Sequence, residues 1–218
     1  MKSLVLKDLY NMGHNAKSML FSQLILAFAL IPSVGVESYI ITSGILFSMM
    51  IITTFSFDDH SKWLKYAMVM PVTKKDVVVG KFVVLLIFSA IGAFFGLVIG
   101  SIGGLLIHQV ILNSPSNVLT LLLTSGASLV IAEIMGSMSI PLLFKFGAEK
   151  ARILLFVSCT IPAAICFGFY KLLTLLGVSF TGRSIFILLC LSPILVLVWN
   201  LVMYQISYGL FAKKELLD

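Results

Sequence analysis

Few side chains in this sequence have the types and spacing that chemistry on a substrate would need. The three histidines, His14, His60 and His108, are far apart, and no HExxH pair that could bind zinc is present. Gly80-Lys81 is not part of a P-loop, because it has neither a glycine five residues earlier nor a following Ser or Thr. A Gly-x-Ser-x-Gly nucleophile elbow is also absent. The sequence therefore predicts no catalytic, cofactor or metal site here, and any energy source must be another chain.

Glu133 is the acidic residue that stands inside a long apolar run. An ionisable group deep in a membrane is costly, so its side chain should face a bundle interior or a wet cavity, or be protonated. Two interpretations stay open: a polar contact on a substrate path or at a protomer interface, and a neutral carboxyl group bonded to a neighbouring serine or backbone carbonyl. An intramembrane enzyme using Glu133 is a further hypothesis, although membrane proteases of the prenyl-endopeptidase type need paired glutamates.

These polar groups are carried by a chain of 218 residues that is 60% hydrophobic and 11% charged, with a mean hydropathy of +1.12. Apolar runs of about eighteen or more residues recur, each long enough to cross a hydrocarbon layer as a helix. Backbone groups in lipid must be bonded within the chain, so continuous apolar runs predict helices. The sequence predicts one all-α membrane domain over residues 1–218. Its six transmembrane helices are expected at about 18–35, 39–56, 82–107, 118–143, 152–174 and 184–208.

The positive charges lie on one side of these predicted spans. Thirteen Lys and Arg residues fall in the N-terminus, the 56–81 loop, the 145–152 loop and the C-terminal tail, against two in the segments on the other side. The positive-inside rule then places both termini and those two loops in the cytoplasm. The net charge of +6 belongs to these membrane-flanking segments, so the expected surrounding is membrane lipid and no nucleic acid is indicated as a partner.

Residues 1–17 predict an amphipathic helix ahead of the first span. Val5, Leu9 and Met12 recur at helical spacing, with polar residues opposite them, among them Lys7. Such a helix can lie in the headgroup layer on the cytoplasmic side. The alternative is that it only extends the first span into the cytoplasm.

The predicted third span carries glycines at strict intervals of four residues, at Gly92, Gly96, Gly100 and Gly104. With this spacing they form one small-residue stripe that lets another helix approach closely. Whether that helix belongs to the same chain or to a second protomer is open from the sequence.

The loop between the second and third spans, residues 57–81, is polar and charged enough to make specific contacts. A capping box beginning at Ser56 predicts the start of a short helix, and Pro71 is expected to end it. A second capping box beginning at Thr73 predicts a helix that continues into the third span.

Charged and apolar residues fall on opposite sides of the predicted short helix. One face carries Asp58, Lys62 and Lys65, and the other carries Trp63 and Met70. The helix could simply anchor the loop at the membrane surface, with Trp63 at headgroup level. It could also be a docking element whose side chains enter a groove on a cytoplasmic partner.

Two stretches give the sequence a resemblance to a known family. Asp58–Lys81 (DDHSKWLKYAMVMPVTKKDVVVGK) follows the second span, and Pro141–Arg152 (PLLFKFGAEKAR) follows the fourth. With these stretches at these positions, the chain resembles, over essentially its whole length, the small type-2 permease subunits of bacterial ATP-binding-cassette (ABC) exporters. Those subunits have six spans and both termini inside.

The resemblance implies a location in the bacterial cytoplasmic membrane and a pair of permease protomers, as a homodimer or a heterodimer. Each protomer is then expected to dock one separate ABC ATPase subunit, which binds ATP and Mg, so that this chain needs no cofactor of its own. Residues 1–17 correspond to the elbow helix, and Asp58–Met70 contains the coupling helix. The implied docking residues are Asp58, Asp59, Lys62, Trp63, Lys65, Tyr66 and Met70. The second cytoplasmic loop is close enough to join that surface with Phe146, Glu149, Lys150 and Arg152.

The cargo is the least determined part of the function. Similar compact permeases export amphipathic or antimicrobial peptides or confer resistance to them, and others move lipids or drugs. An apolar interior with many aromatic residues suits a hydrophobic or amphipathic cargo, so we expect export of a peptide such as a toxin or an antimicrobial peptide. The main alternative is a substrate-binding importer component, because the vitamin-binding subunits of energy-coupling-factor importers are also six-span chains of similar size.

Overall fold

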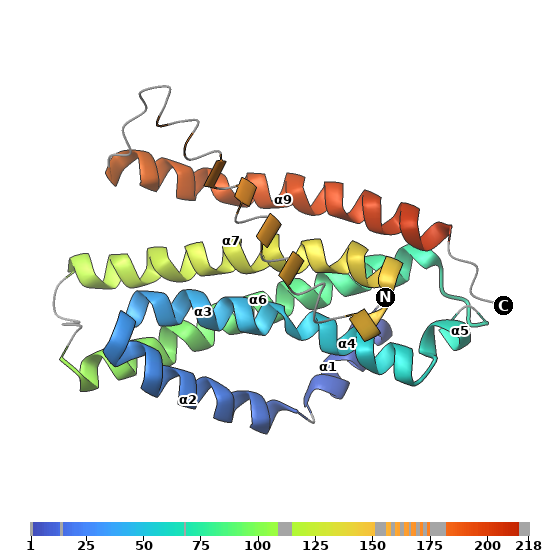
Figure 1. Cartoon of the computed structure of the whole chain (residues 1–218), viewed down its shortest axis with the longest axis horizontal. Helices are drawn as coiled ribbons and strands as arrows, with labels where there is room; N and C mark the ends of the chain where they lie inside the picture. Colours follow the sequence, from blue (N-terminus) through green and yellow to red (C-terminus); the bar gives the residue numbers. More distant parts are fainter. Residues whose placement is uncertain are drawn as a thin grey trace.

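The computed structural model describes residues 2–13, 15–67, 69–108, 115–150 and 182–213, together with scattered residues between 156 and 174. Throughout this described part of the chain the regular secondary structure is helical (Figure 1). The elements are α1 (Lys2–Gly13), α2 (Ala16–Val34), α3 (Val36–Ser48), α4 (Met50–His60), α5 (Trp63–Ala67), α6 (Lys74–Leu106), α7 (Pro115–Phe146), the 3-10 helix η1 (Ala148–Lys150) and α9 (Gly182–Ala212).

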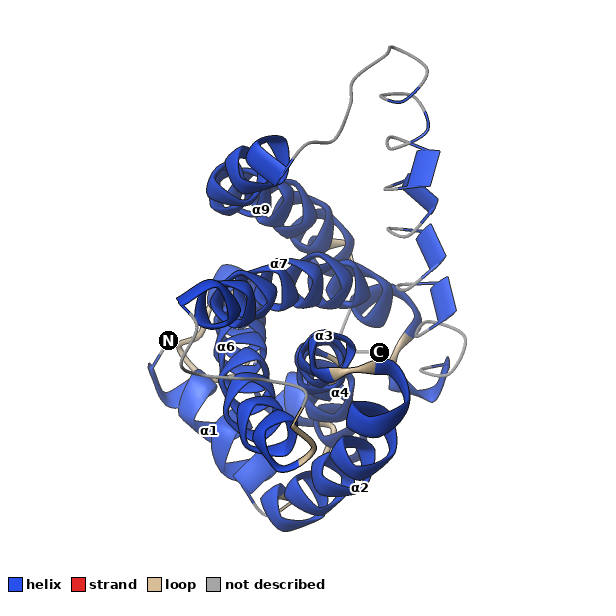
Figure 2. Ribbon diagram, turned by 90° about the vertical axis from the view of Figure 1, so that its left-hand side faces the viewer, coloured by secondary structure: helices blue, strands red, loops and turns tan. Residues whose placement is uncertain are grey.

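Three helices form the centre of the bundle. α3, α6 and α7 each pack against the other two. α2 lies outside them against α3 and α6, while α9 runs along α7 and also touches α6. Figure 2 shows α7 between α9 on one side and α3 and α6 on the other. The short α1 packs against α6 and α4.

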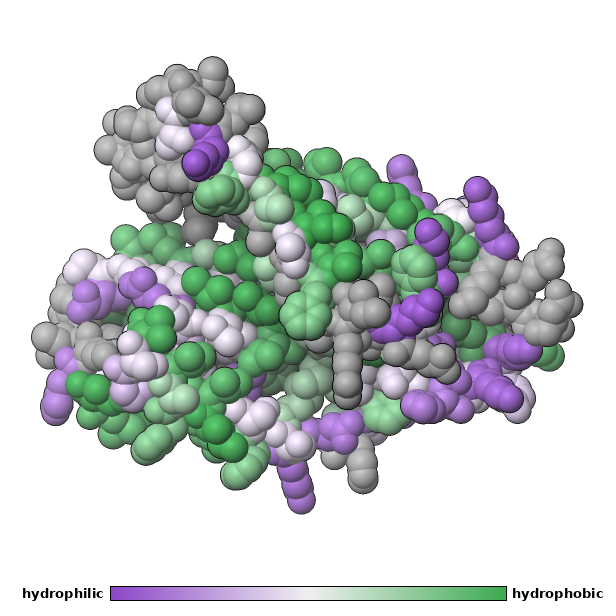
Figure 3. Space-filling view, viewed as in Figure 1, coloured by the Kyte–Doolittle hydropathy of each residue, from purple (hydrophilic) through white to green (hydrophobic). Residues whose placement is uncertain are grey.

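Five helical segments of the described chain are long and apolar enough to cross a membrane. They are Lys17–Val34, Val36–His60, Lys74–Leu106, Ser116–Phe146 and Leu191–Ala212. Figure 3 shows apolar side chains over most of the middle of the molecule and strongly polar ones concentrated at the end that carries α5. The predicted all-α membrane fold is confirmed. The predicted fifth span, 152–174, lies mostly outside the described residues.

Two predicted spans have different boundaries in the structure. The second, expected at 39–56, is helical over Val36–His60, where α3 and α4 join at Met49. The third, expected from residue 82, belongs to α6, which begins at Lys74 and is 33 residues long. At 1.5 Å per residue α6 measures about 50 Å. It therefore extends well beyond a hydrocarbon layer of about 30 Å.

The capping box predicted at Thr73 is present, and the one predicted at Ser56 is not. Thr73 Oγ1 accepts a hydrogen bond from the N–H of Asp76 (3.2 Å), and the N–H of Thr73 donates to Asp76 Oδ2 (3.2 Å). Ser56 lies inside α4 instead, so the prediction of a helix start there is wrong. The helix continues through Ser56 because Phe55 is buried in the core and Asp58 is drawn into buried ion pairs.

The glycine stripe of α6 packs against α3 of the same chain. A Cβ atom on Gly96 would lie 3.1 Å from the Ile40 carbonyl oxygen, and one on Gly92 would lie 2.6 Å from Phe47 Cβ. Across the same contact, Ser43 Oγ donates to the Gly92 carbonyl oxygen (3.1 Å). All members of the stripe are buried, namely Gly92, Gly96, Gly100 and Gly104. The close approach of α3 and α6 depends on these missing side chains.

Candidate cytoplasmic docking site

The short helix α5 lies at one end of the bundle (Figure 1), where strongly polar side chains gather (Figure 3). Its inner side packs onto the core, where Ala67 is fully buried and Trp63 and Leu64 are half-buried. Other residues predicted for docking are exposed on and around α5, and we call them the α5 surface: Lys62, Lys65, Tyr66 and Met70.

The sequence predicted that Met70 and Trp63 share one face of a helix, and this prediction is wrong. α5 ends at Ala67, and the N–H of Met70 donates to the Ala67 carbonyl oxygen in a turn (3.2 Å). Pro71 follows, and a proline disfavours the helical conformation of the residue before it. The Met70 side chain is 54% exposed.

Four charged side chains close to α5 form a closed ring of ion pairs, which we call the ion-pair quartet. Lys7 and Asp8 come from α1, while Asp58 comes from α4 and Lys81 from α6. Lys81 Nζ lies 2.6 Å from Asp58 Oδ2 and 2.9 Å from Asp8 Oδ2. Lys7 Nζ lies 3.1 Å from Asp8 Oδ1 and also pairs with Asp58 Oδ1. Each carboxylate oxygen thus lies within ion-pair distance of an ammonium group, and the four formal charges cancel.

The ion-pair quartet is largely removed from solvent. The side chains of Asp58, Lys81 and Asp8 are 2%, 3% and 5% exposed, and that of Lys7 is 24% exposed. A buried charge costs several kcal/mol in desolvation, which only full pairing can offset. Thr54 Oγ1 also accepts a hydrogen bond from Lys81 Nζ (3.2 Å). The quartet therefore holds α1, α4 and α6 in register, because sliding one of them would leave a buried charge unpaired.

Asp58 faces this buried cluster, so its carboxylate does not belong to the exposed surface that the sequence predicted for docking. Its connection to α5 runs through Lys7, whose Nζ lies 3.5 Å from the centroid of the Trp63 ring. An ammonium group over an aromatic face is attracted by the ring quadrupole. Lys7 thereby links α5 to the three helices of the quartet.

Asp59 connects the loop that follows α4 to the loop that follows α7. Its Oδ2 accepts a hydrogen bond from the N–H of Ala148, the first residue of η1 (2.8 Å). Gly147, just before it, has a φ of +74°, and its N–H donates to the Leu143 carbonyl oxygen (2.9 Å). This left-handed glycine closes the end of α7 and turns the chain toward Asp59. The end of α4 and the start of η1 are held side by side.

The second loop adds exposed side chains next to this contact. Phe146 is 43% exposed, Lys150 is exposed, and the Lys150 Nζ lies 5.8 Å from the centroid of the Phe146 ring. The Glu149 side chain and Arg152, which were also predicted here, lie outside the described residues. Phe146 and Lys150 have the same mixture of apolar and basic character as the α5 surface.

The sequence does not predict the ion-pair quartet. Helical spacing assigns Lys7 to the polar side of α1 and gives no role to Lys81. One signal was available: Asp8 stands three residues after Val5 and four before Met12, which places it on the apolar side of the helix. A carboxylate at that position needs a buried cation, and the sequence does not say which helix supplies it.

Glu133 lies in the interior, where α7 meets α6 and α9. The residue is 1% exposed; its Oε1 accepts a hydrogen bond from Ser89 Oγ, and its Oε2 accepts one from Asn200 Nδ2 (3.1 Å). One turn further along α7, Ser137 Oγ accepts a hydrogen bond from Trp199 Nε1 (3.0 Å). The interior position and the serine partner agree with the sequence analysis, which did not predict the contact with Asn200.

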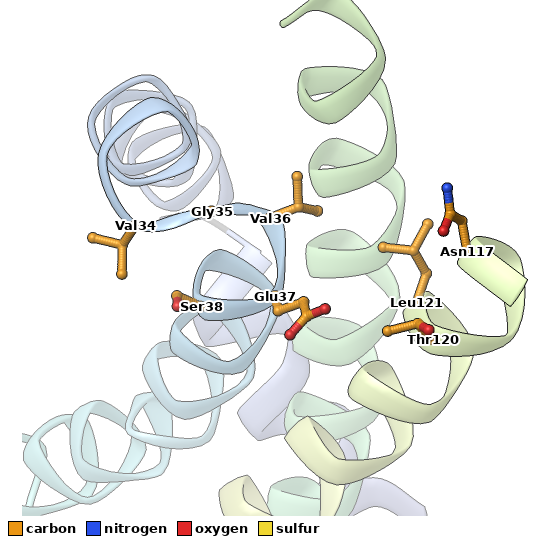
Figure 4. Close-up of a pocket in the computed structure, with 8 residues that line it drawn as sticks. All are labelled: Val34, Gly35, Val36, Glu37, Ser38, Asn117, Thr120 and Leu121. Atoms are coloured by element: carbon orange, nitrogen blue, oxygen red, sulfur yellow. The ribbon is translucent and has the colours of Figure 1, made fainter. Parts of the chain in front are cut away.

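A hollow of about 330 Å³ lies at the end of the molecule opposite α5. Figure 4 shows the Glu37 side chain extending from the first turn of α3 toward α7, where Asn117 and Thr120 lie. Among the described residues that line it, Glu37 alone is charged. A carboxylate there is favoured by the exposed N–H groups of the helix start, so Glu37 has a structural explanation. Within the described chain, no three His, Cys, Asp or Glu side chains are grouped to hold a metal ion.

Comparison with known protein families matches residues 3–212 to the family described as ABC-2 family transporter protein. The match spans α1 to α9 and includes the α5 surface and the ion-pair quartet. No match was found among curated proteins or among solved structures.

Proposed function

The chain belongs to the ABC-2 family and is a membrane-spanning permease subunit of an ABC transporter, and we propose that it exports an amphipathic peptide such as a toxin or an antimicrobial peptide. In this family ATP is hydrolysed by separate ABC ATPase subunits, which are the partners of the permease. The family and the apolar helices make the chain a multi-pass protein of the cell membrane.

The observation that supports docking of the ATPase on this chain is the α5 surface beside η1. Tyr66 is 64% exposed and Met70 54% exposed, and the basic side chain of Lys62 is exposed as well. Tyr and Met are enriched in protein interfaces relative to the rest of the protein surface. We assign the docking of the ATPase to this surface together with Phe146 and Lys150.

The ion-pair quartet gives a docked ATPase a route into the membrane bundle. A displacement of α5 moves Trp63, which is the first residue of this helix. Because Lys7 lies over the Trp63 ring, the displacement also reaches Asp8 and Asp58, the buried partners of Lys7. Because the quartet resists the separation of its charges, α1, α4 and α6 would follow α5 as one body. We therefore assign Lys7 and Lys81 a positioning role in coupling.

The contact between α3 and α6 is too close to hold a peptide. The contact between α3 and α6 leaves no room even for a methyl group at Gly92, where a Cβ would lie 2.6 Å from Phe47 Cβ. A peptide therefore has no path along this contact, and we place its route between two protomers, each with its own ATPase. The exposed apolar side chains of the outer helices suit such a contact as well as they suit lipid.

The direction and the cargo can be tested with inside-out membrane vesicles that contain the permease together with its ATPase. We expect ATP-dependent accumulation of at least some members of a panel of fluorescent amphipathic peptides in these vesicles. The control is the same complex with a catalytically inactive ATPase. Accumulation only in right-side-out vesicles loaded with ATP would show import, and a panel that never exceeds the control would exclude peptide export.

A further inference from the structure

The cytoplasmic end of α6 and the end of α9 carry a basic and aromatic cluster that the docking of the ATPase does not use. Lys75 Nζ lies 5.7 Å from the centroid of the Tyr208 ring. The Tyr208 ring lies 6.4 Å from that of Tyr204, and the Tyr204 ring lies 6.2 Å from that of Phe82, both measured between centroids. A row of ring contacts thus leads from the ammonium group of Lys75 along both helices.

This row continues into a groove of about 320 Å³ between α6 and α9, whose lining includes Phe82 and Tyr204. Further along, the lining is apolar and exposed, with Leu86 on α6 and Leu201 on α9, which are 55% and 61% exposed. Lys75 lies one helical turn before Val79, another lining residue, so its side chain stands in line with the groove. The groove is therefore apolar along its length and positively charged at one end.

The charge of Lys75 is not neutralised by the described part of the chain. Lys75 is exposed and forms no ion pair with a carboxylate there. The adjacent carboxylate of Asp76 accepts hydrogen bonds from the N–H and the hydroxyl group of Thr73 in the capping box. The neighbouring Lys74 donates to the Ala212 carbonyl oxygen at the end of α9 (3.0 Å). An anion at the end of the groove would complement the ammonium group of Lys75.

The length of this arrangement matches one leaflet of a bilayer. At 1.5 Å per residue, Lys75 and Leu86 are about 16 Å apart along the continuous helix α6. Half of a hydrocarbon layer of about 30 Å is about 15 Å. Tyrosine is enriched where acyl chains meet headgroups, which is the height of Tyr208 when Leu86 lies near the bilayer midplane.

We propose that the groove between α6 and α9 binds an anionic phospholipid of the cytoplasmic leaflet, with an acyl chain along the two helices and the headgroup phosphate beside Lys75. The positive-inside rule assigns this end of the chain to the cytoplasm, and anionic lipids attract lysines at that surface. A zwitterionic lipid is a poorer match, because its own ammonium group also approaches Lys75. The site is independent of the direction of transport and of the cargo.

Lipid binding to the purified complex of permease and ATPase tests this site. We would titrate the delipidated complex in detergent with phosphatidylglycerol and phosphatidylcholine of identical acyl chains, and count bound lipids by native mass spectrometry. The first phosphatidylglycerol per permease is expected to bind at a half-saturating concentration about fivefold below that of phosphatidylcholine, as for one lysine near a membrane surface.

Lys75→Met should abolish the preference for phosphatidylglycerol, and Lys75→Arg should keep it. Lys17→Met is the matched control, because it removes an exposed lysine of α2 that does not line the groove. Val83→Trp narrows the groove and leaves Lys75 in place, so it should weaken the binding of both lipids.

Three results would overturn the site. They are equal affinities of the wild-type complex for the two lipids, an unchanged preference in Lys75→Met, and the same loss of preference in Lys75→Met and Lys17→Met. An apolar helix of a second protomer in the groove would exclude both lipids, so the absence of saturable binding would also overturn it.

Discussion

Lys7, Asp8, Asp58 and Lys81 show how single residues decide the geometry of this permease. The charge of each side chain would be unfavourable if it were buried alone, and the two positive and two negative charges neutralise one another. Replacing a whole buried ion pair with apolar residues is often neutral or stabilising, so net stability does not explain the arrangement. The quartet fixes the relative positions of α1, α4 and α6, because any other register would leave a buried charge unpaired.

The substitution Lys81→Met tests this account of the quartet. It leaves two buried carboxylates with one ammonium group, and we expect the free energy of unfolding to fall by about 3–5 kcal/mol, as when one partner of a buried pair is removed. Thermal unfolding of the purified complex in detergent measures the change. Lys75→Met, at an exposed lysine of the same helix, should have little effect.

Restoring the charge balance should recover part of that loss. The double variant Lys81→Met/Asp58→Asn leaves one carboxylate for Lys7, so we expect it to unfold at a higher temperature than Lys81→Met alone. Equal unfolding temperatures for Lys81→Met and Lys75→Met would show that the buried pairing contributes nothing.

At the scale of elements, the sequence predicted that the glycine stripe of α6 makes a close helix contact. It did not predict that the partner helix is α3. The four-residue spacing of the glycines indicates a flat helix face, and the structure fills that face with α3. The same spacing would serve a contact between protomers, so the sequence could not distinguish them. The two capping boxes give the same lesson: the motif at Thr73 follows a turn and starts a helix, whereas Ser56 already lies inside one.

Gly96→Leu is expected to force α3 and α6 apart. A Cβ at this position already lies 3.1 Å from the Ile40 carbonyl oxygen and from Ser43 Cβ, so a larger side chain cannot be accommodated without moving a helix. Overpacking of this kind costs about 1–3 kcal/mol or more, measurable as a lower unfolding temperature, with Gly96→Ala intermediate. Gly209→Leu is the matched control, because a Cβ there meets nothing within 4 Å. Similar unfolding temperatures for both leucine variants would contradict the packing account.

At the scale of the whole molecule, the sequence was sufficient for the membrane class and the all-helical fold, because these follow from long apolar runs. The position of Glu133 in the interior also follows from its chemistry. The quartet and the Glu133–Asn200 contact do not, because each depends on which faces of distant helices meet. The hydrogen bond between Asp59 and Ala148 likewise joins residues that are 89 positions apart, and no local sequence pattern predicts it.

The central claim is that the α5 surface docks the ABC ATPase, and retention of the ATPase by a tagged permease during purification tests it most directly. Lys62→Glu/Tyr66→Ala should weaken binding about tenfold or more, since an interface tyrosine can contribute about 2 kcal/mol and the charge reversal adds to it. The matched control is Lys2→Glu/Tyr10→Ala, the same changes at exposed residues of α1. Loss of the ATPase from the α5 variant alone is the predicted result. Wild-type retention by the α5 variant would contradict the claim.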